Sequence, residues 1–183
     1  MMQELSMNIL DVAENSVRAG ASLVEITVDR QPVNDLMTIT ISDNGCGMSP
    51  EQLKKVSDPF YTTRTTRSVG LGIPFFRMAA ELTGGKLEIS STQGVGTLIK
   101  ASFVLSSIDL MPLGNINETI FVLIHGNPDM DFVFTHRLGG SELVLDTRSF
   151  RRILGDIPLN DPKVSSFIRE FLDENTRELL QAH

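Results

Sequence analysis

The segment that constrains the fold most, residues 38–53, has the sequence TITISDNGCGMSPEQL. Its first half alternates between apolar and polar residues, which predicts a strand that ends at Asp43. Gly45 and Gly47 follow on either side of Cys46, the only cysteine of the chain, and glycine allows a positive φ or a close backbone approach. A helix is then predicted from the Ser-Pro pair onward. The sequence therefore places a carboxylate at a strand end, directly before a loop with little side-chain bulk.

The neighbouring segments alternate between helical and strand patterns. Apolar residues at helical spacing predict a helix over residues 3–19, and strict alternation predicts a hairpin of strands over residues 23–29 and 36–43. A second helix over residues 73–83 and a second hairpin over residues 86–105 follow. This order predicts an α+β fold, a two-layer α/β sandwich with helices on one face of the sheet.

The rest of the chain is expected to form a small α+β extension. Residues 106–117 contain proline and glycine in an unpatterned stretch and are predicted to be a linker between a domain of residues 1–105 and an extension of residues 118–183. The extension could extend the sheet, form a small partner-binding domain or build a dimer interface. It is predicted to contain strands over residues 118–126, 130–138 and 141–147 and helices over residues 148–154 and 161–180.

Composition excludes several classes of protein. The 183-residue chain has a net charge of −7, which argues against a nucleic-acid partner, because such binding needs a basic surface. No apolar run approaches the roughly 20 residues needed for a membrane span, and the N-terminus does not have the pattern of a signal peptide. A single cysteine excludes an internal disulfide. We therefore expect a cytoplasmic protein.

Three polar side chains align on the first predicted helix. Asp11, Asn15 and Arg18 fall within an arc of about 60°, opposite the apolar face. Carboxylate and amide oxygens suit Mg²⁺, and a guanidinium suits phosphate oxygens. The alternative is a solvated polar face.

Asp43 and the glycines after it suggest a binding site for a flat ring. A carboxylate fixed at a strand end can accept hydrogen bonds from an exocyclic amine and from the water bound to that amine. Gly45 and Gly47 would let a flat ring approach the backbone. The alternative is an ordinary turn after a strand.

The segment SVGLGIPFF suggests a phosphate site. Gly70 and Gly72 directly precede a predicted helix, whose N-terminal amides and dipole attract anions. Upstream, Phe60 offers an apolar anchor, while Arg64 and Arg67 offer cations for a terminal phosphate. The alternative is a plain surface loop.

The chain contains, in this order, LDVAENSVRAGAS, DNGCGM, DPFYTTR and VGLGI, and later GVGT. Together these motifs resemble the GHKL superfamily, and the first four resemble its N, G1, F and G2 boxes in the same order. Gyrase-type topoisomerases, heat-shock chaperones, histidine kinases and MutL belong to that superfamily. The resemblance covers residues 1–105 and implies a Bergerat fold, with a mixed sheet and a Mg-ATP site.

The resemblance also implies roles for individual residues. Asn15 would ligate Mg²⁺, Arg18 would approach the phosphates and Asp43 would bind the adenine amine. Asp11 stands where the hydrolytic branches have a glutamate as general base, and it is one methylene shorter. The remaining implied ATP contacts are Gly45 and Gly47 at the adenine, Thr97 through water, Phe60, Arg64 and Arg67 in a lid, and Gly70, Leu71 and Gly72 at the phosphates.

Three functions are compatible with this resemblance. The first is a kinase subunit that acts on a separate partner protein, which the C-terminal extension would dock. It is motivated by the kinase-like second half, and because the N box begins about ten residues into the chain, we expect no acceptor-histidine hairpin before it. The second is a MutL-like ATPase switch, and the third is a non-catalytic ATP/ADP sensor. A homodimer is compatible with each of them, and Cys46 is expected to be a neutral loop residue rather than a redox sensor.

Overall fold

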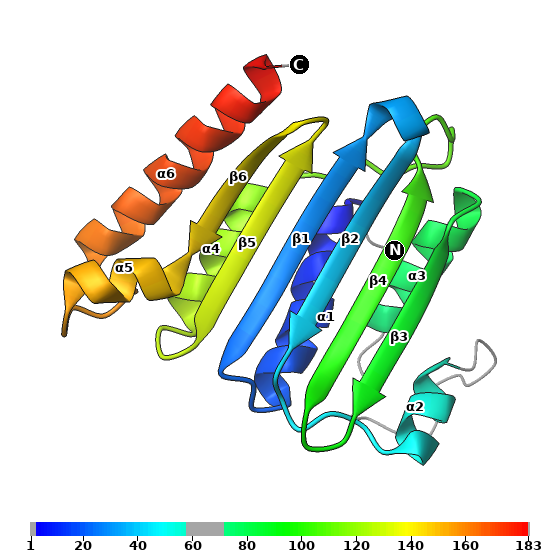
Figure 1. Cartoon of the computed structure of the whole chain (residues 1–183), viewed down its shortest axis with the longest axis horizontal. Coiled ribbons are helices and arrows are strands. Elements are labelled where there is room, and N and C mark those ends of the chain that lie inside the picture. Colours follow the sequence, from blue (N-terminus) through cyan, green and yellow to red (C-terminus); the bar gives the residue numbers. More distant parts are fainter. Residues whose placement is uncertain (1–2, 58–71, 183) are drawn as a thin grey trace.

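The computed structural model describes residues 3–57 and 72–182, and these form one six-stranded sheet with helices packed against it (Figure 1). The predicted α+β sandwich is confirmed. In chain order the elements are α1 (Leu5–Arg18), β1 (Leu23–Gln31), a 3₁₀ turn η1 (Pro32–Asn34), β2 (Leu36–Asp43), α2 (Pro50–Ser57), α3 (Gly72–Leu82), β3 (Lys86–Thr92), β4 (Gly96–Val104), α4 (Ile116–Gly126), β5 (Asp131–Leu138), β6 (Ser141–Asp146), α5 (Thr147–Leu154) and α6 (Pro162–Gln181).

The sheet is mixed, with the strand order β3-β4-β2-β1-β5-β6. All neighbouring strands are antiparallel except β1 and β5, which are parallel. Because β5 pairs with β1 along its whole length, the C-terminal region extends the sheet of the N-terminal region (Figure 1). Sheet extension, one of the three alternatives for this region, is therefore what the structure shows. The division at residues 106–117 remains a prediction.

One predicted element is wrong. Residues 118–126 were expected to form a strand, but they belong to helix α4. The run IFVLI, residues 120–124, is apolar throughout, and an apolar run of this length cannot be assigned to helix or strand from periodicity alone. The helix start is marked by Asn115, whose side-chain oxygen accepts a hydrogen bond from the Glu118 N–H at 3.0 Å. The strands and helices predicted after it are confirmed as β5, β6, α5 and α6.

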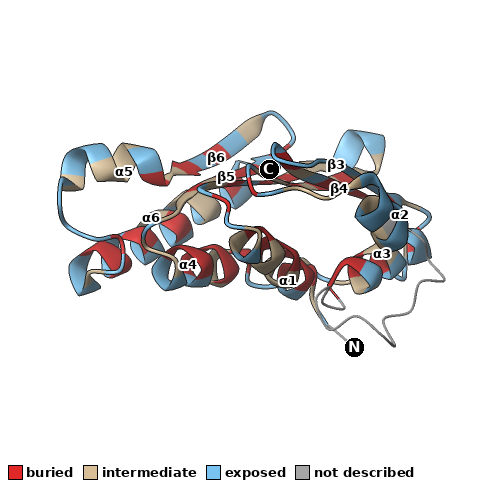
Figure 2. Ribbon diagram, turned by 90° about the horizontal axis from the view of Figure 1, so that it is seen from below, coloured by how far each residue is buried: buried red, intermediate tan, exposed pale blue. Residues whose placement is uncertain are grey.

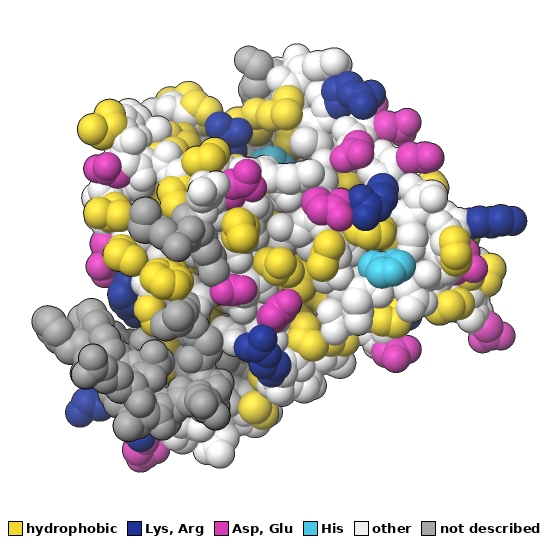
Figure 3. Space-filling view, turned by 180° about the vertical axis from the view of Figure 1, so that it is seen from behind, with side chains coloured by type: hydrophobic (Ala, Val, Ile, Leu, Met, Phe, Trp, Pro, Cys, Tyr) yellow, Lys and Arg dark blue, Asp and Glu magenta, His cyan; other side chains and the backbone are white. Residues whose placement is uncertain are grey.

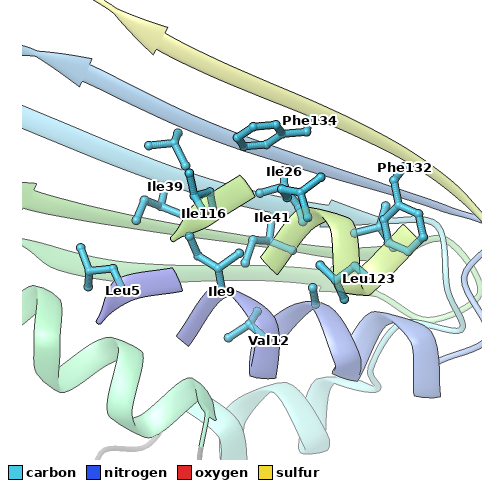
Figure 4. Packing of buried hydrophobic residues seen from close by; sticks show 14 of the residues in the cluster. Leu5, Ile9, Val12, Ile26, Ile39, Ile41, Ile116, Leu123, Phe132 and Phe134 are labelled. Carbon is cyan, nitrogen blue, oxygen red and sulfur yellow. The ribbon is translucent and has the colours of Figure 1, made fainter. Parts of the chain in front are cut away.

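The hydrophobic core lies between the sheet and a row of helices in the order α3, α1, α4 and α6 (Figure 2). Alternate residues of the strands point into this layer, and Figure 4 shows Ile26 and Ile41 of the sheet facing Ile9 of α1. Among the described residues no helix layer covers the opposite face of the sheet (Figure 2), and the polar residues that alternate along β1 and β2 lie on that face. This arrangement fixes α1 against the sheet beside the end of β2. Among the described residues, no helix is long and apolar enough to cross a membrane.

Candidate functional site

Asp43, the last residue of β2, is held by two hydrogen bonds from within the protein. The Ser16 hydroxyl of α1 donates to Oδ2 at 2.6 Å, and the Gly45 N–H donates to Oδ1 at 2.9 Å. Ser16 is only 3% exposed, so its hydroxyl is directed at Asp43 from within the core. Each carboxylate oxygen has more than one acceptor position. Asp43 is therefore fixed in orientation and can still accept further hydrogen bonds.

The two glycines after Asp43 are required by the packing of the protein itself. A Cβ on Gly45 would lie 2.9 Å from both the Cβ and the carbonyl oxygen of Ala19, at the end of α1. Gly47 has a φ of +65°, and a Cβ there would lie 2.1 Å from the backbone oxygen of Thr92. The loop is thus held between α1 and the β3–β4 hairpin. Their expected place beside an adenine ring remains a prediction, but the structure supplies a second reason for glycine.

Asn44 is a structural residue of the site that the sequence analysis missed. Its side-chain oxygen accepts hydrogen bonds from the N–H groups of Ser22 and Leu23, both at 2.9 Å, and its Nδ2 donates to the Ser22 hydroxyl at 2.8 Å. Asn44 therefore ties the loop after β2 to the turn before β1. The asparagine-glycine pair directly after a strand was the available signal, because asparagine side chains often bond to nearby backbone groups.

Thr97 of β4 lies directly opposite Asp43 in the strand register. Its hydroxyl is 2.9 Å from the Ser91 hydroxyl of β3, and the Ser91 Oγ also accepts a hydrogen bond from the Met48 N–H at 2.8 Å. Gly96, just before Thr97, has a φ of +145°, and a Cβ there would be 1.9 Å from the Asp43 carbonyl oxygen. Thr97 therefore lies beside Asp43, its expected contact with the ligand through water remains a prediction, and the sequence analysis did not identify the supporting serine.

The predicted polar face of α1 is present. The Nδ2 of Asn15 is buried without a hydrogen-bond partner, and its Oδ1 accepts a long hydrogen bond from Arg18 at 3.4 Å. Arg18 is well exposed and pairs with Glu14 at 3.0 Å, so its guanidinium lies along the helix surface. Among the described residues, the Asp11 carboxylate has no hydrogen-bond or ion-pair partner. An unpaired carboxylate and a partly unsatisfied amide therefore lie one turn apart.

The start of α3 lies against this face. Gly72 is buried, and a Cβ on it would be 2.8 Å from the Cβ of Asp11. The N-terminal turn of α3, with its free N–H groups and positive dipole end, therefore lies beside the Asp11 carboxylate. The other expected contacts in this region, Phe60, Arg64, Arg67, Gly70 and Leu71, lie outside the described residues.

The side chains that the structure brings together fit a magnesium-phosphate group. Mg²⁺ is usually held by one or two protein oxygens, with phosphate oxygens and waters completing its shell. Asp11 and Asn15 supply such oxygens, and the start of α3 supplies backbone N–H groups for an anion. Among the described residues there is no group of three or more His, Cys, Asp or Glu side chains that could form a closed metal cage. Asp11 and Asn15 alone would therefore hold such an ion only together with oxygens of a ligand or of water.

The N-terminal part of the chain is similar to known proteins. A family model described as "Histidine kinase-, DNA gyrase B-, and HSP90-like ATPase" matches residues 1–107. The chain is 34% identical over 110 residues to the sensor protein kinase FleS of Pseudomonas aeruginosa, a match that covers 60% of this chain and 27% of FleS. It is 32% identical over 110 residues to the non-motile and phage-resistance protein of Caulobacter vibrioides, which covers 57% of this chain and 13% of that protein.

A solved structure extends the likeness to the C-terminal region. The ATPase domain of Aquifex aeolicus MutL complexed with ADP has a TM-score of 0.51 and 16% sequence identity to this chain. The match covers 100% of this chain and 99% of that one, and at this identity it shows the fold alone. In contrast, the chain spans only 13% to 27% of the length of the two curated relatives above.

Proposed function

This chain belongs to the histidine kinase-, DNA gyrase B-, and HSP90-like ATPase family, and we propose that it binds Mg-ATP between α1, the end of β2 and the start of α3. The observation that carries the proposal is the fixed Asp43 carboxylate, which keeps free acceptor positions while Ser16 and Gly45 hold it. A fixed acceptor at the end of a strand is what recognition of an exocyclic amine requires.

Each part of the nucleotide has a proposed contact. Asp43 accepts from the adenine amine, and Thr97 binds the same end of the ring through a water. Gly45 and Gly47 border the ring. Bound Mg²⁺ would supply positive charge at the phosphates, with Asn15 and Asp11 as the protein oxygens that hold it. The resemblance in sequence assigns the remaining phosphate contacts to Arg18, Gly70, Leu71 and Gly72, and the lid contacts to Phe60, Arg64 and Arg67.

We further propose that the protein acts as a kinase subunit on a separate partner protein. The sequence likeness to a sensor protein kinase supports this role. The C-terminal region offers a surface for a partner, because α5 and α6 enclose an apolar groove of about 660 Å³. Ile153, Ile157 and Phe167 line this groove and are 84%, 50% and 54% exposed. Large apolar side chains that stay exposed together often mark an interaction site.

A second copy of the chain is the other candidate occupant of this groove, and the measured mass in solution separates the two. The helix side of the molecule offers a weaker alternative surface, because exposed apolar and charged side chains are interspersed there (Figure 3). We also propose a cytoplasmic location, because the single cysteine, Cys46, is free and exposed, and free thiols are characteristic of reducing compartments.

An ATPase switch is the second candidate function. Its support is the likeness in fold to the MutL ATPase domain over the whole chain, together with an unpaired Asp11 carboxylate beside the start of α3. In this function Asp11 would orient and deprotonate a water for attack on the terminal phosphate. A kinase subunit would instead leave ATP intact until its partner is bound.

One incubation with γ-labelled ATP and Mg²⁺ separates these functions. The kinase proposal predicts that ATP binds with little release of phosphate, and that label transfers to a copurified partner protein. Phosphate release that the Asp11→Asn variant abolishes would instead establish the ATPase switch. A protein that binds no ATP under these conditions would contradict both.

A further inference from the structure

Two hydrogen-bond donors of the protein, the Ser16 hydroxyl and the Gly45 N–H, are directed at Asp43. A hydroxyl has one proton, and Ser16 donates its proton to Asp43 Oδ2 at 2.6 Å. The Gly45 N–H is likewise committed to Oδ1 at 2.9 Å. A carboxylate has no proton to donate, so the unused lone pairs of Asp43 can only accept.

The same reasoning applies to Thr97. Ser91 donates its proton to the Gly96 carbonyl oxygen at 3.0 Å and accepts from the Met48 N–H at 2.8 Å. The remaining lone pair of Ser91 lies 2.9 Å from the Thr97 hydroxyl, so the arrangement that satisfies all these groups has Thr97 donating to Ser91. Thr97 is then left with lone pairs only. In this arrangement neither Asp43 nor Thr97 has a proton to donate into the site, so both can only accept.

From this arrangement we infer that Ser16 and Ser91 are positioning residues that set the base specificity of the site. They hold Asp43 and Thr97 as acceptors, so the site takes a purine with an amino group at position 6 and rejects a purine with an oxo group there. A 6-oxo group would meet Asp43 as one acceptor against another, and the N1–H donor of such a purine lies one ring position away from the place where the fixed carboxylate accepts. The inference rests on the proposed nucleotide function and explains how the protein would select the base.

Ser16 is expected to contribute more to base selection than Ser91. Its side chain on α1 is buried, and its hydrogen bond joins α1 to the end of β2, 27 residues further along the chain. If the hydroxyl is removed, Asp43 retains only the Gly45 N–H and can rotate about its side-chain bonds. The carboxylate would then meet a base edge in several orientations and discriminate less between donors and acceptors.

The test compares Mg-ATP with Mg-ITP, which differ at position 6 of the purine, by calorimetric titration. The wild type is expected to prefer ATP by about 100-fold or more. Ser16→Ala is expected to weaken ATP binding by about tenfold, leave ITP binding unchanged and so reduce the preference. Ser16→Thr, which keeps a hydroxyl, is expected to restore most of the preference. Ser42→Ala on the opposite sheet face is the matched control and should leave both affinities as in the wild type.

Ser91→Ala supplies an independent second arm. It frees the Thr97 proton for donation into the site, so ITP binding is expected to become several-fold tighter. If Ser16→Ala does not fold, Ser16→Cys gives the same comparison, because a thiol is a weak donor.

The possible outcomes separate the inference from the proposed function. If Ser16→Ala keeps the wild-type preference, or weakens ATP and ITP binding equally, the inference is wrong and the proposed function stands. If the wild type binds neither nucleotide, the proposed function fails and the inference fails with it.

Discussion

Gly72 and Asp11 touch at the boundary between α3 and α1, where a Cβ on residue 72 would lie only 2.8 Å from the Cβ of Asp11. The two residues come from segments that the sequence analysis assigned separate roles, one at the phosphates and one as a general base. Their contact places the N-terminal end of α3 beside a carboxylate that has no partner among the described residues. The pair therefore joins the proposed metal and phosphate ends of one site.

Gly72→Ala tests this contact. The added methyl group meets the Cβ of a helical residue, which cannot move without shifting α1 or α3. We expect a loss of about 1–3 kcal/mol in the free energy of unfolding and a weaker affinity for Mg-ATP. Denaturant unfolding and titration measure the two effects. Gly126→Ala at the end of α4 is the matched control, because a Cβ there meets nothing within 4 Å and should cost little.

Asn15→Ala tests the metal end of the site. Removing the amide should lower ATP affinity in the presence of Mg²⁺ by about tenfold or more, and change it little when EDTA is present. Titrations with and without the metal measure this difference. Asn34→Ala, at the far end of the β1–β2 hairpin, should bind as the wild type does. Equal losses with and without Mg²⁺ would remove Asn15 from metal binding.

His136 makes stability depend on pH. The residue is 2% exposed, and neither ring nitrogen has a hydrogen-bond partner in the described part of the chain. Burial, with a smaller contribution from Arg30, lowers its pKa to about 4. Between pH 6.5 and 4 the unfolded chain binds a proton that the folded chain does not, so stability falls as the pH falls through this range. From pH 7 to pH 5 we expect a loss of about 2 kcal/mol from this residue.

Denaturant unfolding at both pH values measures this loss. His136→Leu should remove most of it, because leucine cannot be protonated. His125→Gln is the control and should retain the loss. A wild type whose stability is the same at pH 7 and pH 5 would contradict the prediction.

Arg151 ties α5 to the turn before β5. Its guanidinium bonds the Asp131 carboxylate at 2.7 Å and the backbone oxygens of Pro128 and Met130 at 2.6 and 2.7 Å. Because Arg151→Ala removes a donor from three acceptors and leaves the Asp131 carboxylate with only the Thr147 hydroxyl as a described side-chain donor, we expect it to lower the free energy of unfolding by about 2–3 kcal/mol. Arg152→Ala, whose described side-chain hydrogen bond is to Ser149 alone, should cost less than about 0.5 kcal/mol. Equal effects of the two variants would show that the Arg151 network does not stabilise the fold.

Local patterns in the sequence predicted most of the fold. The hairpin of β1 and β2 followed from period-two alternation, and α1 followed from apolar residues at helical spacing. Helix α4 was missed because its central run, residues 120–124, is apolar without interruption, so no periodicity distinguishes that run from a buried strand. The parallel pairing of β5 with β1 is a contact between distant segments, and no local pattern encodes it.

The sequence indicated only part of the candidate site, again because contacts between distant segments leave no local pattern. Asp43 and Asn15 belong to motifs with recognisable order and spacing. Ser16 and Ser91 were missed because a serine is chemically unremarkable until its partner is known, and their partners lie 27 and 43 residues away in the sequence. The place of Gly45 and Gly47 beside a ring stays a prediction. The structure shows that the two glycines lie close to Ala19 and Thr92 of the protein itself.

The most direct test of the account is a calorimetric titration of Mg-ATP into the wild type and into Asp43→Ala, with the fold of each checked by circular dichroism. The account predicts one site per chain in the wild type and a loss of affinity of about 100-fold or more in the folded variant, because the adenine amine loses its charged acceptor. If Asp43→Ala folds and binds Mg-ATP as tightly as the wild type, or if the folded wild type does not bind it, the account is contradicted.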